Sequence, residues 1–126
     1  MDNDYKIWIK RAESALSLGK VDDREEIYYE DLCFQLQQAA EKALKAYLIY
    51  NKIEPPKTHS FRVLINKIET SIVLCPDEIR RTIELEDYAV QTRYPGDYTP
   101  VDEDEYSDAL KITENAIVWI KKQLGL

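Results

Sequence analysis

The chain has 126 residues, of which 44% are hydrophobic, and a formal net charge of −7 at pH 7. This length suits one domain over residues 1–126. So acidic a surface repels phosphate groups, and we therefore expect no binding to duplex DNA. No stretch approaches the roughly 20 apolar residues that cross a membrane, and the first residues lack the apolar run of a signal peptide. We expect a cytoplasmic protein that makes no membrane contact.

Cysteine and histidine usage argues against metal chemistry. Cys33 and Cys75 lie far apart and lack the spacing of a metal site, and the chain has one histidine. In a reducing compartment both cysteines should be free thiols, and neither has an identifiable activating partner. The sequence therefore predicts no metal site and no cofactor.

Apolar residues recur at helical spacing along the chain, and strand-like alternation is absent. The expected helices run from about Asp4 to Leu18, Tyr29 to Lys52, Ser60 to Thr70, Pro76 to Val90, and Pro100 to Leu124. In the first of them, Trp8 and Ala12 belong to an apolar stripe, and Gly19 can end the helix. The pattern predicts an all-α fold, an up-and-down antiparallel bundle of about five helices.

The second expected helix is the longest and most apolar. Apolar side chains cover about half of its circumference, so it should lie at the centre of the bundle. Gln37 projects at the edge of this surface, where a glutamine needs hydrogen-bond partners and serves either the structure or a ligand. Gln38, Lys42 and Lys45 form the polar face. Apolar residues on that side could form a dimer seam or a partner surface; they are Phe34, Leu48 and Ile49.

The segment between the second and third expected helices carries the single histidine. The Pro55-Pro56 pair cannot continue a helix, and Ser60 or Thr58 can cap the next one. Lys57 and His59 precede this helix start, where backbone N–H groups favour anions. His59 has two interpretations, a local capping or packing role and a contact with phosphate.

The segment "TRYPGDYTP", from Thr92 to Pro100, joins the last two expected helices. Its prolines could make it a stiff connector, but it is long for a helix–helix joint, and long ordered loops often carry function. Arg93 offers a guanidinium group and Tyr94 a stacking plane, both of which suit nucleotide recognition. Arg93 could equally form a structural ion pair.

The last expected helix starts beside this segment. Thr99 can cap it, Pro100 suits its first turn, and Asp102 resembles the acid of a weak capping box. The acidic run "DEDE" that begins at Asp102 is explained by the positive end of a helix dipole.

Two stretches of the chain resemble the HEPN family (higher eukaryotes and prokaryotes nucleotide-binding domain). They are "YEDLCFQLQQAAEKALKAYLIYNKIEPPKTHS" and "LEDYAVQTRYPGDY". The resemblance implies an all-α bundle that binds a nucleotide such as ATP, or a short RNA. It also implies a homodimer that partners a small nucleotidyltransferase, sometimes as a toxin–antitoxin system. Many members of the family are metal-independent ribonucleases, in which an arginine is followed shortly by a histidine.

The chain departs from that ribonuclease motif. After Arg93, the position of the motif histidine holds Asp97, Tyr98 or Thr99. Tyrosine is a poor general acid or base near neutral pH without strong tuning. Only Arg93, and loosely Tyr98, carry over as catalytic candidates.

The preferred interpretation is therefore a non-catalytic, nucleotide-binding module that acts as a homodimer. Its candidate nucleotide-binding residues are Arg93, Tyr94, Gln37, Lys42, Lys57 and His59. Two alternatives remain open, a ribonuclease with a degenerate motif and a pure protein-interaction module.

Overall fold

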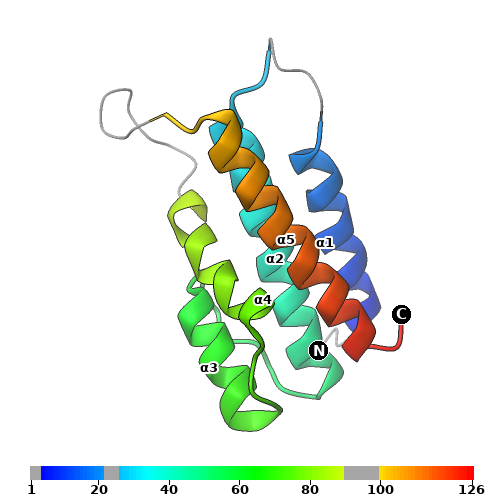
Figure 1. Ribbon diagram of the computed structural model, residues 1–126. Helices are drawn as coiled ribbons and strands as arrows, with labels where there is room; N and C mark the ends of the chain where they lie inside the picture. Colours follow the sequence, from blue (N-terminus) through cyan, green and yellow to red (C-terminus); the bar gives the residue numbers. More distant parts are fainter. Residues whose placement is uncertain (1–3, 22–25, 90–99) are drawn as a thin grey trace.

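The computed structural model describes residues 4–21, 26–89 and 100–126. These residues form α1 (Tyr5–Gly19), α2 (Tyr29–Tyr50), α3 (Phe61–Ser71), α4 (Asp77–Arg80), the 3₁₀ helix η1 (Arg81–Ala89) and α5 (Glu103–Gln123). No strand occurs in these three described ranges. The predicted all-α helical bundle is confirmed (Figure 1).

The long helices alternate in direction along the chain. Figure 1 shows α1, α2 and α5 side by side, with the start of α1 and the end of α5 at the same end of the bundle. The Tyr29 ring of α2 stacks on the Tyr106 ring of α5, and the Tyr47 ring packs edge-on against that of Trp119. α2 and α5 therefore run in the same direction, as the second and fourth helices of an up-and-down bundle do, with α1 and η1 opposed to them.

α2 lies at the centre of the core, as its broad apolar surface predicts. Thirteen of its residues are buried, and it contacts α1, α3, η1 and α5. Leu48 and Ile49 are only 0% and 7% exposed, so these two residues belong to the core of their own chain. The predicted apolar seam on the polar side of α2 is therefore wrong for both, because α2 is surrounded by neighbouring helices rather than open on one side.

The fourth predicted helix is not a single α-helix. Its α-helical part is limited to α4, and η1 continues from Arg81 to Ala89 as a 3₁₀ helix. The three-residue period of a 3₁₀ helix aligns residues i and i+3. Thr82 and Leu85 are buried on this line, and Tyr88 packs against the core one step further on. Core-facing side chains at every third position thus match the tighter helix.

Helix α5 starts later than the capping pattern predicts. Asp102 is itself the N-cap, and its Oδ1 accepts a hydrogen bond of 2.8 Å from the backbone N–H of Glu105. The prediction that Asp102 lies inside the first turn was wrong. As the N-cap, its side chain accepts a hydrogen bond from the Glu105 N–H, which has no partner within the helix. Thr99, the predicted cap, lies outside the described residues. The acids of "DEDE" do occupy this helix start.

Gly19, at the end of α1, lies where two other helices come close. The Tyr106 hydroxyl of α5 donates a buried hydrogen bond of 2.7 Å to the Gly19 carbonyl oxygen. A Cβ atom on Gly19 would lie 2.6 Å from Leu36 Cδ2 and 3.3 Å from the Leu32 carbonyl oxygen of α2. Hydrogen is therefore the side chain that this three-helix junction accommodates.

Among the described residues, no helix is long and apolar enough to cross a membrane.

Gly19→Ala should lower the free energy of unfolding by about 1–3 kcal/mol, because the added methyl group overpacks the buried Leu36. Urea unfolding measures the change. Ser14→Ala on the exposed side of α1 is the matched control, and it should change stability by less than about 0.5 kcal/mol. Equal stability of Gly19→Ala and wild type would show that the junction is looser than described.

Candidate functional site

A buried carboxylate on α2 gathers polar side chains around it. Glu41 is 4% exposed. Its Oε1 lies 3.0 Å from Gln37 Nε2 and 2.9 Å from His59 Nδ1, and its Oε2 lies 2.9 Å from Lys45 Nζ. Gln37 and Lys45 come from the same helix, one turn before and one turn after Glu41. His59 comes from the connector between α2 and α3.

These partners keep Glu41 ionised. Burial alone would raise the pKa of Glu41, but hydrogen bonds from Lys45, His59 and Gln37, together with the Lys45 charge, outweigh burial and lower the pKa below its usual value. A buried charge that lacked such partners would take up a proton instead. Glu41 is therefore a fixed negative charge inside the bundle.

The hydrogen bonds continue from Gln37 to the surface of α2. Gln38 Nε2 donates to Gln37 Oε1 at 2.8 Å, and Lys42 Nζ donates to Gln38 Oε1 at 3.0 Å. Burial lowers the pKa of Lys42, and the nearby cations Arg11 of α1 and Lys45 act in the same direction, while Glu41 opposes them. Lys42 thus lies where additional negative charge would be favourable.

We call this group the α2 polar cluster. Its members are Gln37, Gln38, Glu41, Lys42, Lys45 and His59. Three of the predicted site residues belong to it, namely Gln37, Lys42 and His59. Lys57 is exposed in the same connector. Arg93, Tyr94 and Tyr98 lie outside the described residues.

The sequence analysis did not identify Glu41 as a site residue, and it placed Lys45 on the polar face without its ion pair to Glu41. The spacing of Gln37, Glu41 and Lys45 at i, i+4 and i+8 was a usable signal, because such residues share one face of a helix. The contact with His59 spans 18 residues of sequence, and no helical period could reveal it.

The start of α3 is capped by the chain itself. Ser60 is the N-cap, as predicted, and its hydroxyl oxygen accepts from the Val63 N–H. Glu86 of η1 also lies here, where its Oε1 accepts hydrogen bonds of 3.2 Å from Ser60 Oγ and 3.1 Å from the Arg62 N–H. Because the Glu86 carboxylate occupies the positive end of α3, it would repel an external phosphate and competes with it for the same N–H groups.

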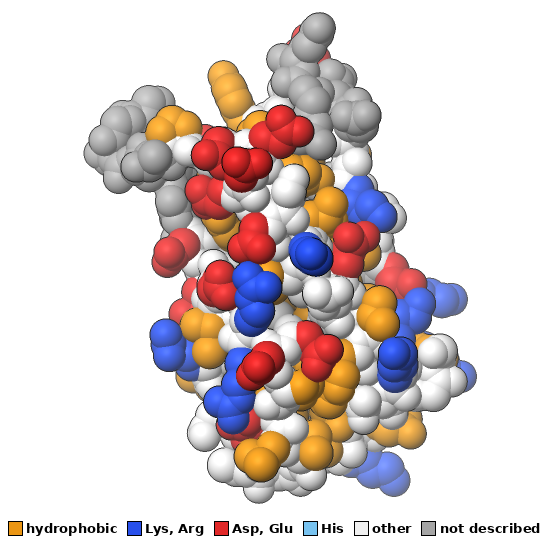
Figure 2. Space-filling view, in the orientation of Figure 1, with side chains coloured by type: hydrophobic (Ala, Val, Ile, Leu, Met, Phe, Trp, Pro, Cys, Tyr) orange, Lys and Arg blue, Asp and Glu red, His pale blue; other side chains and the backbone are white. Residues whose placement is uncertain are grey.

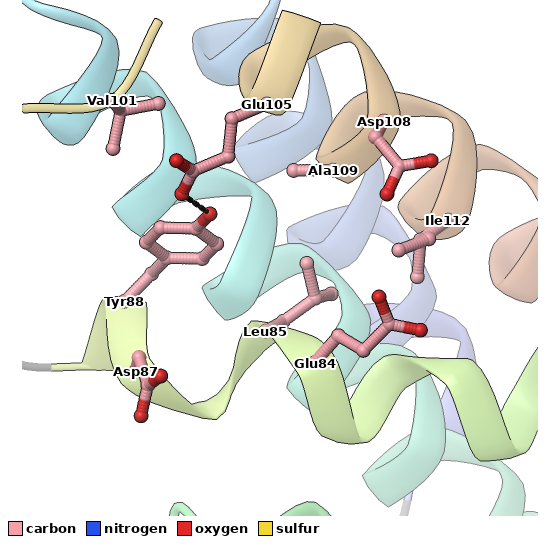
Figure 3. A pocket seen from close by; sticks show the side chains of 9 residues that line it. All are labelled: Glu84, Leu85, Asp87, Tyr88, Val101, Glu105, Asp108, Ala109 and Ile112. Atoms are coloured by element: carbon pink, nitrogen blue, oxygen red, sulfur yellow. Dashed lines mark hydrogen bonds between the residues drawn. The ribbon is translucent and has the colours of Figure 1, made fainter.

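A cavity of about 310 Å³ lies between η1 and the first half of α5. Its acidic side chains come from both helices, and they are Glu84, Asp87, Glu105 and Asp108. In Figure 3, Tyr88 points across the cavity toward Glu105, to which its hydroxyl donates a hydrogen bond. Burial and this bond raise the pKa of Tyr88. Phosphate would be repelled here.

The acidic cavity and the α2 polar cluster differ in charge. Figure 2 shows acidic side chains gathered over the end where α5 begins, close to the acidic cavity. Glu41 contacts Lys45 and His59, and Lys42 interacts with Arg11 of α1 and Lys45 as well as with Glu41. Of the two places, only the α2 polar cluster suits an anion.

Neither thiol is an activated nucleophile, although Cys33 interacts with Tyr88 and Glu105 of the acidic cavity. Cys33 and Cys75 are buried and free, as predicted. Burial and nearby acids raise the pKa of Cys33 to about 12 and that of Cys75 to about 11. Thiols that stay protonated are poor nucleophiles. In the described ranges, no group of three or more His, Cys, Asp or Glu side chains could hold a metal ion.

The fold and the α2 polar cluster define a helical bundle with a buried, multiply paired carboxylate at its centre. The HEPN domain model matches residues 5–123, and the chain therefore belongs to the HEPN domain family. No curated protein sequence matches the chain.

Two solved structures resemble the whole chain. TT1696 from Thermus thermophilus has a TM-score of 0.80 and 23% identity, covering 95% of this chain and 98% of its own. ST0689, described as an archaeal HEPN homologue, has a TM-score of 0.71 and 28% identity, covering 94% of this chain and 96% of its own. The likeness to TT1696 shows the shared fold alone.

Glu41→Gln should lower the free energy of unfolding at neutral pH by about 3 kcal/mol, because Lys45 then keeps a buried charge without its partner. The pKa of Glu41 is lower in the folded chain than its usual value. The carboxylate's stabilising effect is therefore present above the unfolded pKa and is lost as pH falls through the folded pKa. Urea unfolding from neutral to strongly acidic pH should show the difference between wild type and variant shrinking.

The exposed carboxylate of Glu114 provides the control. It lies 3.2 Å from Lys20 Nζ, with both side chains more than 40% exposed, so Glu114→Gln should cost about 0–1 kcal/mol. A Glu41→Gln variant as stable as this control at neutral pH would contradict the role given to the buried carboxylate.

Proposed function

We propose that this chain is a nucleotide-binding HEPN module whose α2 polar cluster contacts the phosphate groups of its ligand, ATP or a similar nucleotide, or a short RNA. The observation that supports this most is the charge around Glu41. Two cations, Arg11 and Lys45, and one carboxylate, Glu41, are the charges that act on Lys42, on a chain with a net charge of −7. A local excess of positive charge on an acidic protein attracts a small anion without coating the surface with nucleic acid.

Within the cluster, Lys42 is the residue we expect to bind phosphate directly. Lys45 is already bonded to Glu41, and its side chain is only 13% exposed. Lys42 bonds only an uncharged amide within the cluster, and burial is the main cause that lowers its pKa, with smaller contributions from Arg11 and Lys45 that Glu41 opposes. A phosphate beside Lys42 would stabilise the charged form of this lysine, which burial disfavours, and would accept a charge-assisted hydrogen bond from it.

His59 is suited to a second contact. Its side chain is 70% exposed although Nδ1 is held by Glu41, so Nε2 can meet a ligand. We further propose that Arg93 binds phosphate and Tyr94 stacks on the base. The guanidinium group and the aromatic ring support these two roles. The family resemblance supports a homodimer that partners a small nucleotidyltransferase in a toxin–antitoxin-type system.

Lys42→Met should weaken ATP binding by about tenfold or more, the equivalent of one charge-assisted hydrogen bond of about 1.5–3 kcal/mol. Equilibrium titration of the purified protein at low salt measures the affinity. The affinity of the wild-type protein should also fall as salt is added, because exposed charges are screened.

Lys67→Met is the matched control, since it removes the same charge from an exposed position on α3 and should leave the affinity unchanged. Arg93→Ala in the same titration tests the role proposed for that residue. If Lys42→Met and Lys67→Met bind ATP equally well, the α2 polar cluster is not the phosphate site.

Sedimentation analysis tests the proposed homodimer. We expect twice the mass of one chain at micromolar concentration, and a monomer at every concentration would contradict the proposal. Phe34 is half-buried on α2, whereas Leu48 and Ile49, the other two residues of the predicted seam, are buried. Phe34→Glu therefore asks whether this part of α2 belongs to the dimer interface, with exposed Val63→Glu on α3 as the comparison.

A further inference from the structure

His59 is held at one nitrogen and open at the other. Its Nδ1 lies 2.9 Å from Glu41 Oε1, and its side chain is 70% exposed. The neighbouring Ser60 is fixed as the N-cap of α3 and by Glu86 of η1. The imidazole ring therefore has a defined orientation, with its far edge toward solvent.

The contacts of Glu41 determine which nitrogen carries the proton. Gln37 Nε2 and Lys45 Nζ can only donate, and both approach the Glu41 carboxylate. An ionised carboxylate can only accept hydrogen bonds, so Nδ1 of His59 must donate to it. In the neutral ring the free lone pair is then on Nε2, the nitrogen that faces outward.

We propose that His59 is a nucleophile that accepts a phosphoryl group at Nε2. This step goes beyond nucleotide binding, because it predicts a covalent phosphohistidine. The arrangement has the features of an activated nucleophile, a reactive atom whose orientation is set by a second group that is itself held in place. The chemical class of the co-substrate is a phosphoryl donor, and Lys42, which interacts with Glu41, can attract its negative charge.

The reaction is balanced without another reactant. The Nε2 lone pair attacks phosphorus and forms an N–P bond, while the bond from phosphorus to the leaving group breaks and the leaving group departs with that electron pair. The proton on Nδ1 stays in place, so the phosphorylated ring carries a positive charge. Glu41 accepts the hydrogen bond from that ring and stabilises this charge, as a carboxylate does for an imidazolium ion in a catalytic triad.

Potassium phosphoramidate tests the proposal without a nucleotide. Its nitrogen leaves as ammonia with the P–N electron pair. The protein has one histidine, so phosphohistidine detected by intact mass and ³¹P NMR can be assigned to His59. We expect one phosphoryl group on Nε2, added at least about tenfold faster than to N-acetylhistidine, equivalent to about 1.4 kcal/mol of transition-state stabilisation.

Glu41→Gln should remove this advantage, because an amide does not fix the Nδ1–H tautomer or balance the charge of the ring. Glu114→Gln is the control, since it neutralises an exposed carboxylate that pairs with Lys20 and does not belong to the α2 polar cluster, and it should keep the wild-type rate. If Glu41→Gln does not fold, the proposal is still tested by two results for the wild-type protein: its rate relative to N-acetylhistidine, and which ring nitrogen carries the phosphoryl group.

A wild-type rate equal to that of N-acetylhistidine, or addition at Nδ1, would overturn the proposal and would leave His59 as a structural partner of Glu41. Neither result bears on the ATP titration of Lys42→Met, so failure of this inference and failure of the proposed function remain distinguishable.

Discussion

The buried carboxylate of Glu41 imposes a constraint that the rest of the structure must meet. An ionised carboxylate inside a protein costs several kcal/mol unless it is paired and hydrogen-bonded. Gln37 and Lys45 supply two partners from the same helix, but the third, His59, is brought by the connector that follows α2. That connector therefore has to return to the middle of α2 before α3 can begin.

The position of α3 follows from this return. His59 and the α3 cap Ser60 are consecutive, and Ser60 in turn contacts Glu86 of η1. η1 lies against α5, where Tyr88 donates to Glu105. Three polar contacts, joined by short stretches of backbone, thus connect the centre of α2 with the start of α3, η1 and the start of α5, alongside the apolar core that they share.

The same constraint gathers basic side chains near Glu41. Glu41 brings Lys45 and His59 together on one part of the bundle, and Lys42 lies there beside Arg11. The acids of η1 and α5 line a cavity elsewhere. The cations around Lys42 are the physical basis of the proposed contact with a small phosphorylated ligand.

The parts of the fold that depend on local sequence could be predicted, whereas the site could be predicted only in fragments. Helical periodicity predicted the ends of α1 and α2 to within a few residues. It missed η1, because the apolar pattern was compared with the period of an α-helix and not with the three-residue period of a 3₁₀ helix. Gln37, Lys42 and His59 were candidates for separate reasons, and nothing in the sequence showed that Glu41 joins them. An isolated helix does not reveal what packs over each face, so the burial of Glu41 and its pairing with His59 depend on how the connector after α2 returns.

Chemical-shift mapping of the ¹⁵N-labelled protein during titration with ATP tests the central claim most directly. We expect the largest changes on the backbone amides of residues 37–45 and on the imidazole nitrogens of His59, with saturation at one nucleotide per chain. Changes concentrated on η1 and the start of α5, around the acidic cavity, would contradict the claim, as would a titration that leaves the α2 polar cluster unchanged.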